Sequence, residues 1–252
     1  MNARKYKNRK TSITITIAIL IVIVMLAAAL IRLITENKNV INDVPGNNMA
    51  SETGNKSSAE EREYISLNKT LVIKEADNYT GIYMEDGTDE PVTGILKIEV
   101  TNVSGEPVQY AEINLDVKGE TAHFTVTALP AGATAVLLER NRMEYRDDID
   151  YMSAEAECVN MAMFNSELSL HEDKLKIQTL DGALNITNIS GEDITDTIIL
   201  CYKSYQNDMY YGGIAYRIKL EGGLKAGELR QIMAEHFQEP GSQMVFVDFV
   251  AA

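Results

Sequence analysis

Basic residues are scarce in this sequence once its first 32 positions are passed. Six of the 23 Lys and Arg residues precede Glu36, the first acidic residue, and the remaining 17 face 37 acidic residues. The net charge of −14 therefore sums a small basic tip and a large acidic body. A nucleic-acid partner needs clustered Lys and Arg that displace counterions from phosphates. We therefore expect no nucleic-acid partner.

Motifs of catalysis and metal binding are also scarce. The three His residues lie far apart, without the short spacing of a zinc site. There is no G-x-S-x-G elbow, and no glycine-rich loop leads into Lys-Ser or Lys-Thr. We predict no catalytic, cofactor-binding or metal-ligating residue, and a protein that is not an enzyme. Paired carboxylates leave no such motif, so an envelope hydrolase stays an alternative.

One long apolar run is present, from Ile13 to Ile31, with 19 uncharged residues. As a helix it spans about 28 Å, close to the thickness of a bilayer core. Five basic residues precede it, so the positive-inside rule places the N-terminus in the cytoplasm. We predict a basic cytoplasmic tip over 1–12 and a transmembrane helix, in contact with the lipid bilayer, over 13–34. A cleaved signal peptide ending near Ala27–Ala29 is the alternative, although its apolar part is usually only about 7–15 residues long.

The remainder of the chain divides into a polar segment and a region of alternating residues. Asn, Ser, Gly, Glu and Lys dominate 35–62, which predicts a flexible linker. From residue 63 onward, short apolar runs alternate with polar residues and end at Gly, Pro, Asn or Asp. In Tyr110–Val117, the residues Ile113, Leu115 and Val117 share one face. This pattern is typical of antiparallel strands with one solvated face, and it predicts a mainly β fold.

An internal repeat organises this β region. Thr101–Val108 recurs as Thr187–Ile194 without a gap, at an offset of 86, and an L-x-A-G segment follows each copy. The repeat predicts two tandem antiparallel β-sandwich modules over 63–165 and 166–252. In each N-x-S-G-E turn we expect Asn and Ser to bond to local backbone groups and Gly to adopt a positive φ. The first copy carries an insert over 77–94.

These motifs resemble a known family. A strand, then N-x-S-G, then an alternating strand, then L-x-A-G is similar to bacterial cell-surface modules of the FxLYD and CARDB type. In the second copy, Leu200-Cys201-Tyr202 followed by Leu224–Glu228 resembles the FxLYD pattern, with Lys203 in place of the expected Asp. The resemblance implies immunoglobulin-like sandwiches in the cell envelope of a Gram-positive bacterium. It implies no activity, since a fold does not fix a function.

The two cysteines, Cys158 and Cys201, raise the question of a disulfide, because such bonds form outside the cell. The ungapped repeat aligns Cys201 with the core residue Leu115, and Cys158 shares a face with Ala154 and Ala156. We therefore predict that each thiol is buried in the core of its own module and is free. A Cys158–Cys201 bond, which needs Cα atoms within about 7 Å, is the alternative.

Aromatic residues gather in two segments that we regard as candidate contacts for a partner. One segment is a predicted hairpin in the second copy, and the other is the insert of the first copy. The candidate contacts are Tyr205, Met209, Tyr210, Tyr211, Tyr83 and Met84. Tyrosine gives contact area at low entropic cost, although tyrosines that simply cover a sheet would give the same pattern. For a binding site, replacing Tyr210 and Tyr211 with Ser should leave the fold intact and abolish partner capture.

Two functional hypotheses follow. The first is a non-enzymatic, single-pass membrane protein that presents two immunoglobulin-like modules outside the cell for adhesion, scaffolding or assembly, with an envelope protein or a surface polymer as partner. The second is an exoplasmic subunit of a membrane complex that binds a ligand or a cation. Carboxylates in 85–90 and 147–150 would suit Ca²⁺, although we interpret both segments as solvated loops.

Overall fold

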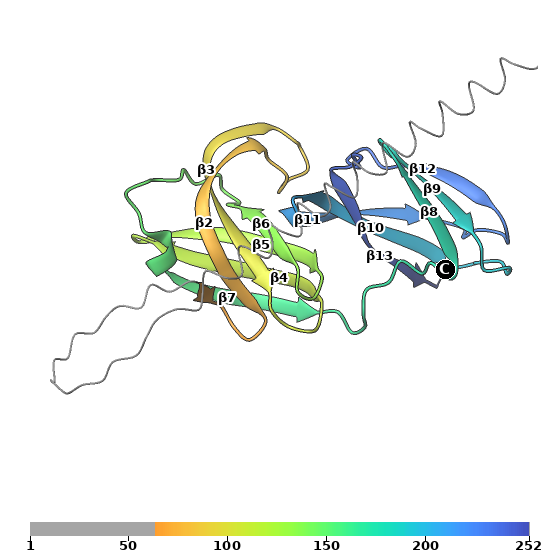
Figure 1. Ribbon diagram of the computed structural model, residues 1–252, viewed down its shortest axis with the longest axis horizontal. Helices are drawn as coiled ribbons and strands as arrows, with labels where there is room; N and C mark the ends of the chain where they lie inside the picture. The colour runs from red at the N-terminus through yellow and green to blue at the C-terminus, as the bar shows by residue number, and fades with distance from the viewer. Residues whose placement is uncertain (1–63, 252) are drawn as a thin grey trace, which may run out of the picture. The chain divides into compact units, whose positions relative to one another are not determined.

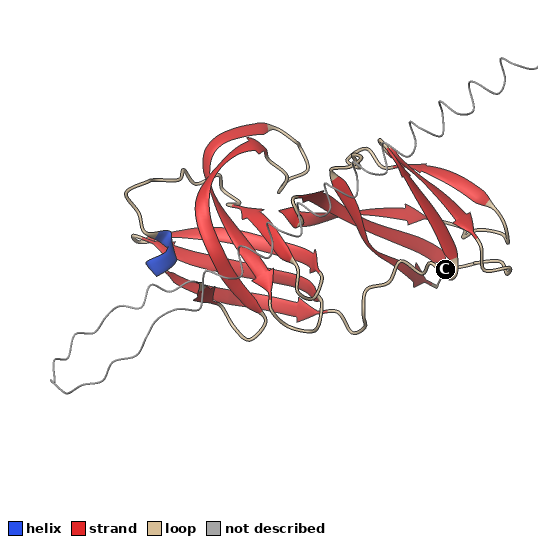
Figure 2. Cartoon of the chain, viewed as in Figure 1, coloured by secondary structure: helices blue, strands red, loops and turns tan. Residues whose placement is uncertain are grey.

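The computed structural model describes residues 64–251. The predicted cytoplasmic tip at 1–12, transmembrane helix at 13–34 and linker at 35–62 lie outside these residues. Within residues 64–251 no helix is long and apolar enough to cross a membrane. Strands dominate this part of the chain, with a single 3₁₀ turn, η1 (Tyr151–Ser153), as the only helical element described (Figure 2). The predicted mainly β fold is confirmed.

The first module contains seven strands in two sheets. They are β1 (Ile65–Ser66), β2 (Leu71–Ile82), β3 (Pro91–Asn102), β4 (Val108–Val117), β5 (Glu120–Leu129), β6 (Thr134–Leu138) and β7 (Glu155–Met163). Strands β1-β2-β3-β6 follow one another in the first sheet, and β5-β4-β7 form the second. The insert lengthens the β2–β3 hairpin, which continues to the pair Ile82 and Pro91. The alternation in β4 buries Ile113 and Leu115 between the sheets, together with Phe124 of β5.

The second module repeats this topology with six strands. They are β8 (Leu175–Leu180), β9 (Ala183–Asn188), β10 (Thr197–Gln206), β11 (Met209–Leu220), β12 (Leu229–Met233) and β13 (Ser242–Val250). The sheet β8-β9-β12 corresponds to β2-β3-β6, and the series β11-β10-β13 corresponds to β5-β4-β7. The duplication visible in the sequence is therefore also a duplication of strand order.

In each module, one Asn side chain joins the two repeated motifs by hydrogen bonds. The Asn102 side chain donates to the carbonyls of Glu106 (2.9 Å) and Pro130 (3.1 Å), so it ties the N-x-S-G-E turn to the L-x-A-G loop. Asn188 donates to Glu192 (2.7 Å) and Leu224 (3.0 Å) in the same way. Both amides are fully buried, and buried polar groups that are satisfied in this way fix the loops they join.

The glycines of the two turns differ. Gly191 has the expected positive φ of 81°, whereas Gly105 is not among the glycines with positive φ. The expectation of a positive φ is therefore wrong for the first copy. Because the Asn and Ser bonds are the same in both turns, with Ser104 and Ser190 donating to their Asn at 2.7 and 2.8 Å, these bonds define the turn rather than the glycine.

The two modules share a sheet. Strand β6 pairs in parallel with β11 through Ala135–Tyr210 and Val136–Tyr211, which creates a seven-stranded sheet in the order β1-β2-β3-β6-β11-β10-β13 (Figure 1). Residues 64–251 accordingly belong to one compact unit. We call the region around this β6–β11 pair, with the insert that packs on it, the joint.

The register of β10 corrects one prediction. Ile198, Leu200 and Tyr202 face the core of the second module, whereas Cys201 is fully buried on the opposite side, in the core cluster of the first module. The prediction that Cys201 faces its own module's core is therefore wrong. In an alternating strand a shift of one residue exchanges the two faces, and the ungapped alignment is off by one residue here. Both cysteines are free, as predicted, with Cys158 only half-buried.

Candidate functional site

The predicted contact residues lie at the joint. Tyr83 of the insert and Tyr210 of the hairpin are 2% and 6% exposed. Tyr79, Met209 and Tyr211 pack against the apolar cluster beneath the insert, and this cluster includes Tyr83, Val136 and Leu138. Tyr205 packs edge-on against Tyr210, with 5.0 Å between ring centroids. The two segments predicted as separate partner contacts therefore meet within the chain.

A buried polar network lies at the centre of the joint. The carboxylate of Glu85 accepts hydrogen bonds from the N–H groups of Gly213 (2.8 and 2.9 Å) and Leu138 (2.9 Å). The Lys203 ammonium, fully buried, donates to the carbonyls of Thr127 (2.9 Å) and Gly213 (3.2 Å). The backbone N–H and C=O of Gly213 thus join an anion from the first module to a cation from the second.

Burial governs the protonation of this network. Loss of solvation lowers the pKa of Lys203 to about 8, and the neighbouring Glu85 carboxylate opposes that change. Loss of solvation likewise raises the pKa of Glu85, opposed by hydrogen bonds from Leu138 and Gly213. Each charge is stable in this position mainly because backbone groups and the other charge replace water, so the network couples the two modules electrostatically.

A small polar cavity opens beside the joint. Its volume is about 160 Å³, and it lies between the tip of the insert, the end of β10 and the segment that follows β12. The lining residues are Ile82, Met84, Asp89, Ser204, Gln206, Tyr216, His236, Gln238 and Gly241. Asp89 and His236 approach to 2.9 Å across this cavity, and the His236 ring stacks on Tyr216 with 4.5 Å between centroids. Met84 is thus placed beside a cavity rather than on an open face.

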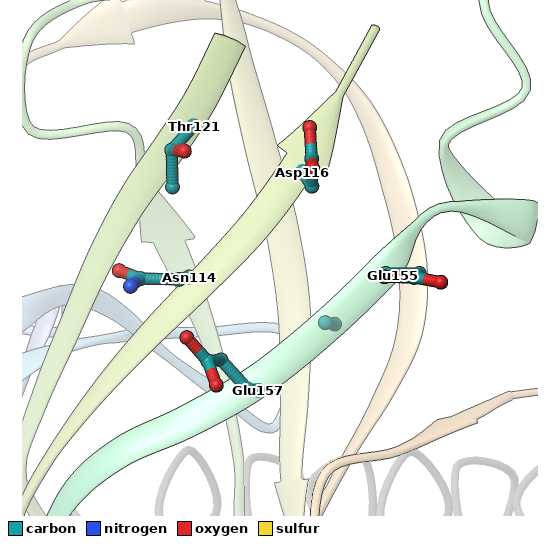
Figure 3. A pocket seen from close by; sticks show the side chains of 6 residues that line it. Asn114, Asp116, Thr121, Glu155 and Glu157 are labelled. Atoms are coloured by element: carbon teal, nitrogen blue, oxygen red, sulfur yellow. The ribbon is translucent and has the colours of Figure 1, made fainter. Parts of the chain in front are cut away.

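A second hollow lies on the outer face of the sheet β5-β4-β7. Asn114, Asp116, Thr121, Glu155, Ala156 and Glu157 line it. Figure 3 shows the Glu157 carboxylate on the side of Asn114, whereas Glu155 points away from both. The acidic side chains do not converge, and no group of three or more potential metal ligands occurs within residues 64–251.

The two acidic segments are engaged in contacts with other side chains. Arg142 pairs with Asp86 at 3.1 Å and with Glu90 at 3.3 Å, and Lys118 pairs with Asp148 at 3.2 Å. Glu85 belongs to the joint rather than to a solvated loop, contrary to our interpretation. No pattern in the sequence indicates this role, because Glu85 lies 128 residues from Gly213 and follows no recognisable motif.

The sequence matches no protein-family model and no curated protein. The description of the candidate site therefore rests on its geometry.

Proposed function

We propose that the chain is a non-enzymatic, single-pass membrane protein that holds two immunoglobulin-like modules outside the cell for adhesion, scaffolding or assembly of the envelope. Its apolar segment and basic tip support the anchor and the orientation. In each module the first, second and fifth of the six matched strands form one sheet and the other three form the second, which supports an immunoglobulin-like sandwich related to the FxLYD and CARDB type.

The observation that carries the proposal is the joint. Two modules that share a sheet and a buried network present their surfaces at a fixed spacing, as a scaffold requires. A flexible tandem would instead expose the edge of β6 and leave Lys203 in water. The buried Glu85–Gly213–Lys203 network therefore fits a role in which the pair of modules acts as one body.

The test uses the full chain in intact cells. Cysteine is introduced at the exposed residue Gln178, and the cells are treated with a membrane-impermeant maleimide. Labelling before lysis, followed by recovery of a crosslinked envelope protein or surface polymer from native membranes, is the expected result. Labelling only after lysis would exclude the outward orientation, and repeated recovery of the uncrosslinked chain would exclude the scaffold.

The cavity beside the joint favours a second candidate function, a ligand- or cation-binding exoplasmic subunit. The cavity brings one carboxylate, one imidazole and two amides together. A ligand bound there would raise the melting temperature of the full chain by mass action. Calcium is the first probe: a rise that Asp89→Asn abolishes would support this function, and an unchanged melting temperature would exclude calcium as the ligand.

A further inference from the structure

Strand β12 is the counterpart of β6 in the second module. In the first module the outer edge of β6 accepts β11, which forms the joint. In the part of the chain that the structure describes, β12 pairs only with β9, and Figure 1 shows the two strands side by side. The edge that joins the modules in the first copy is therefore open in the second copy.

The outer edge of β12 has backbone N–H and C=O groups that could pair with a further strand. Asn188 donates to the Glu228 carbonyl and Ala234 donates to the Gly182 carbonyl, so the even-numbered residues direct their hydrogen bonds toward β9. In an antiparallel ladder, bonded residues alternate along the strand. The N–H and C=O groups of Leu229, Gln231 and Met233 consequently point away from β9.

The side chains at this edge are apolar and exposed. Leu229 and Met233 are 57% and 69% exposed, the two highest values among the large hydrophobic residues of the described chain. In the first module, the equivalent face of β6 carries Val136 and Leu138, which are buried under the insert and the hairpin. The second module has only Leu180-Asp181-Gly182 in place of the insert, so nothing in the described chain covers this face.

The other sheet edges carry protection that β12 lacks. Strand β1 has two residues, β7 and β13 have irregular registers, and β8 carries Lys176. The edge of β5 lies against Gly213 and Lys203. Strand β12 pairs in regular register, contains no Pro, and directs its only charge, Arg230, toward the Glu221 carbonyl (3.2 Å). Bulges and lysines hinder edge-to-edge pairing, and β12, although only five residues long, has neither.

We propose that β12 pairs antiparallel with β12 of a second copy of this chain. A two-fold axis at Gln231 places Leu229 of each copy opposite Met233 of the other copy. Apolar side chains of one copy therefore lie opposite apolar side chains of the other. Such an isologous contact closes as a dimer and joins the two β8-β9-β12 sheets. The inference names a partner for the scaffold and rests on that proposal for its cellular setting.

Disulfide crosslinking of the full chain in native membranes tests this register. Across the axis the two Gln231 Cα atoms would lie about 5.5 Å apart, within reach of a disulfide. Mild oxidation of the Gln231→Cys chain should give about tenfold more linked dimer than Gln178→Cys, a matched exposed residue on β8. The unsubstituted chain controls for Cys158 and Cys201. Equal yields from the two variants would overturn the proposal.

A second pair of variants tests whether the crosslink reports a specific dimer or random collision of chains. In the Gln231→Cys chain, Leu229→Lys with Met233→Lys sets like charges opposite each other and should lower the linked dimer about tenfold. Leu180→Lys, an exposed residue on the same sheet but away from the axis, should leave the yield unchanged. Linkage that resists the paired lysines contradicts the proposal. A monomer that still crosslinks to another envelope protein refutes the dimer alone and leaves the scaffold standing.

Discussion

At the scale of single residues, Gly213 is a position in the joint that leaves no room for a side chain. A Cβ atom there would lie 1.8 Å from the Thr125 carbonyl oxygen and 2.8 Å from a Glu85 carboxylate oxygen. Because the nearer atom belongs to the backbone, it cannot move aside without a shift of β5. We expect Gly213→Ala to lower the free energy of unfolding by about 3 kcal/mol or more, measured by urea denaturation.

Gly105→Ala is the matched control for this substitution. A methyl group at Gly105 would have no atom within 4 Å, and this glycine is not among those with positive φ, so the change should stay within about 0.5 kcal/mol. Equal stabilities for the two alanine variants would show that β5 and β11 do not approach as closely as described.

Some hydrogen bonds of single residues could be predicted from the sequence, and others could not. The Asn and Ser bonds of the repeated turns could be predicted, because their partners lie within a few positions. The role of Glu139 could not be predicted, although its fully buried carboxylate accepts bonds from the N–H groups of His123, Asn141 and Met143. A buried acid of this kind has the same sequence signature as a solvated one.

At the scale of elements, the β10–β11 hairpin is the part of the second module that reaches the first. Both Tyr210 and Tyr211 pair with β6; the Tyr210 side chain is buried in the core cluster of the first module, and Tyr211 packs on the apolar cluster beneath the insert. Replacing both with Ser should weaken the joint by about 3–5 kcal/mol, since it removes two large side chains from packed positions. Urea unfolding, with hydrogen exchange at β6, measures this loss.

The expected effect on the fold differs from that of an exposed binding hairpin, which would tolerate both replacements. Tyr64→Ser is the control, because Tyr64 is 47% exposed and lies outside the joint; it should change stability by no more than about 0.5 kcal/mol. If the hairpin variant were as stable as Tyr64→Ser, the joint would contribute nothing to folding.

Most elements could be predicted, whereas their pairing between modules could not. Alternation over Tyr110–Val117 indicates β4 to within two residues of its observed start at Val108. The parallel β6–β11 contact involves two residue pairs about 75 positions apart, and it leaves no periodic signal. The ungapped repeat also hides the one-residue shift in β10, which is why it places Cys201 on the wrong face.

At the scale of the whole molecule, the buried Lys203 makes stability depend on pH. Burial lowers its pKa from 10.5 to about 8, so between these values the unfolded chain binds a proton that the folded chain does not. Stability therefore rises with pH through this group, and the cost is fully present below the folded value. Burial raises the pKa of Cys201 from 9.0 to about 11, which has the opposite effect above pH 9.

Comparison with Lys203→Met isolates the lysine from the other groups. The variant should lose about 3 kcal/mol near neutral pH, because Glu85 is left buried without its cation. The stability of the natural chain should then rise relative to the variant by on the order of 1 kcal/mol for each pH unit above 8. Urea unfolding of both chains at several pH values measures the difference.

Lys118→Met serves as the control, since Lys118 and its partner Asp148 are 56% and 73% exposed. An exposed pair contributes little, so this variant should follow the natural chain within about 0.5 kcal/mol at every pH. A gap between the natural chain and Lys203→Met that stayed constant across pH 8 would mean that Lys203 keeps its ordinary pKa. The modules would then be joined by strand pairing and apolar contact, with water reaching the Gly213 peptide.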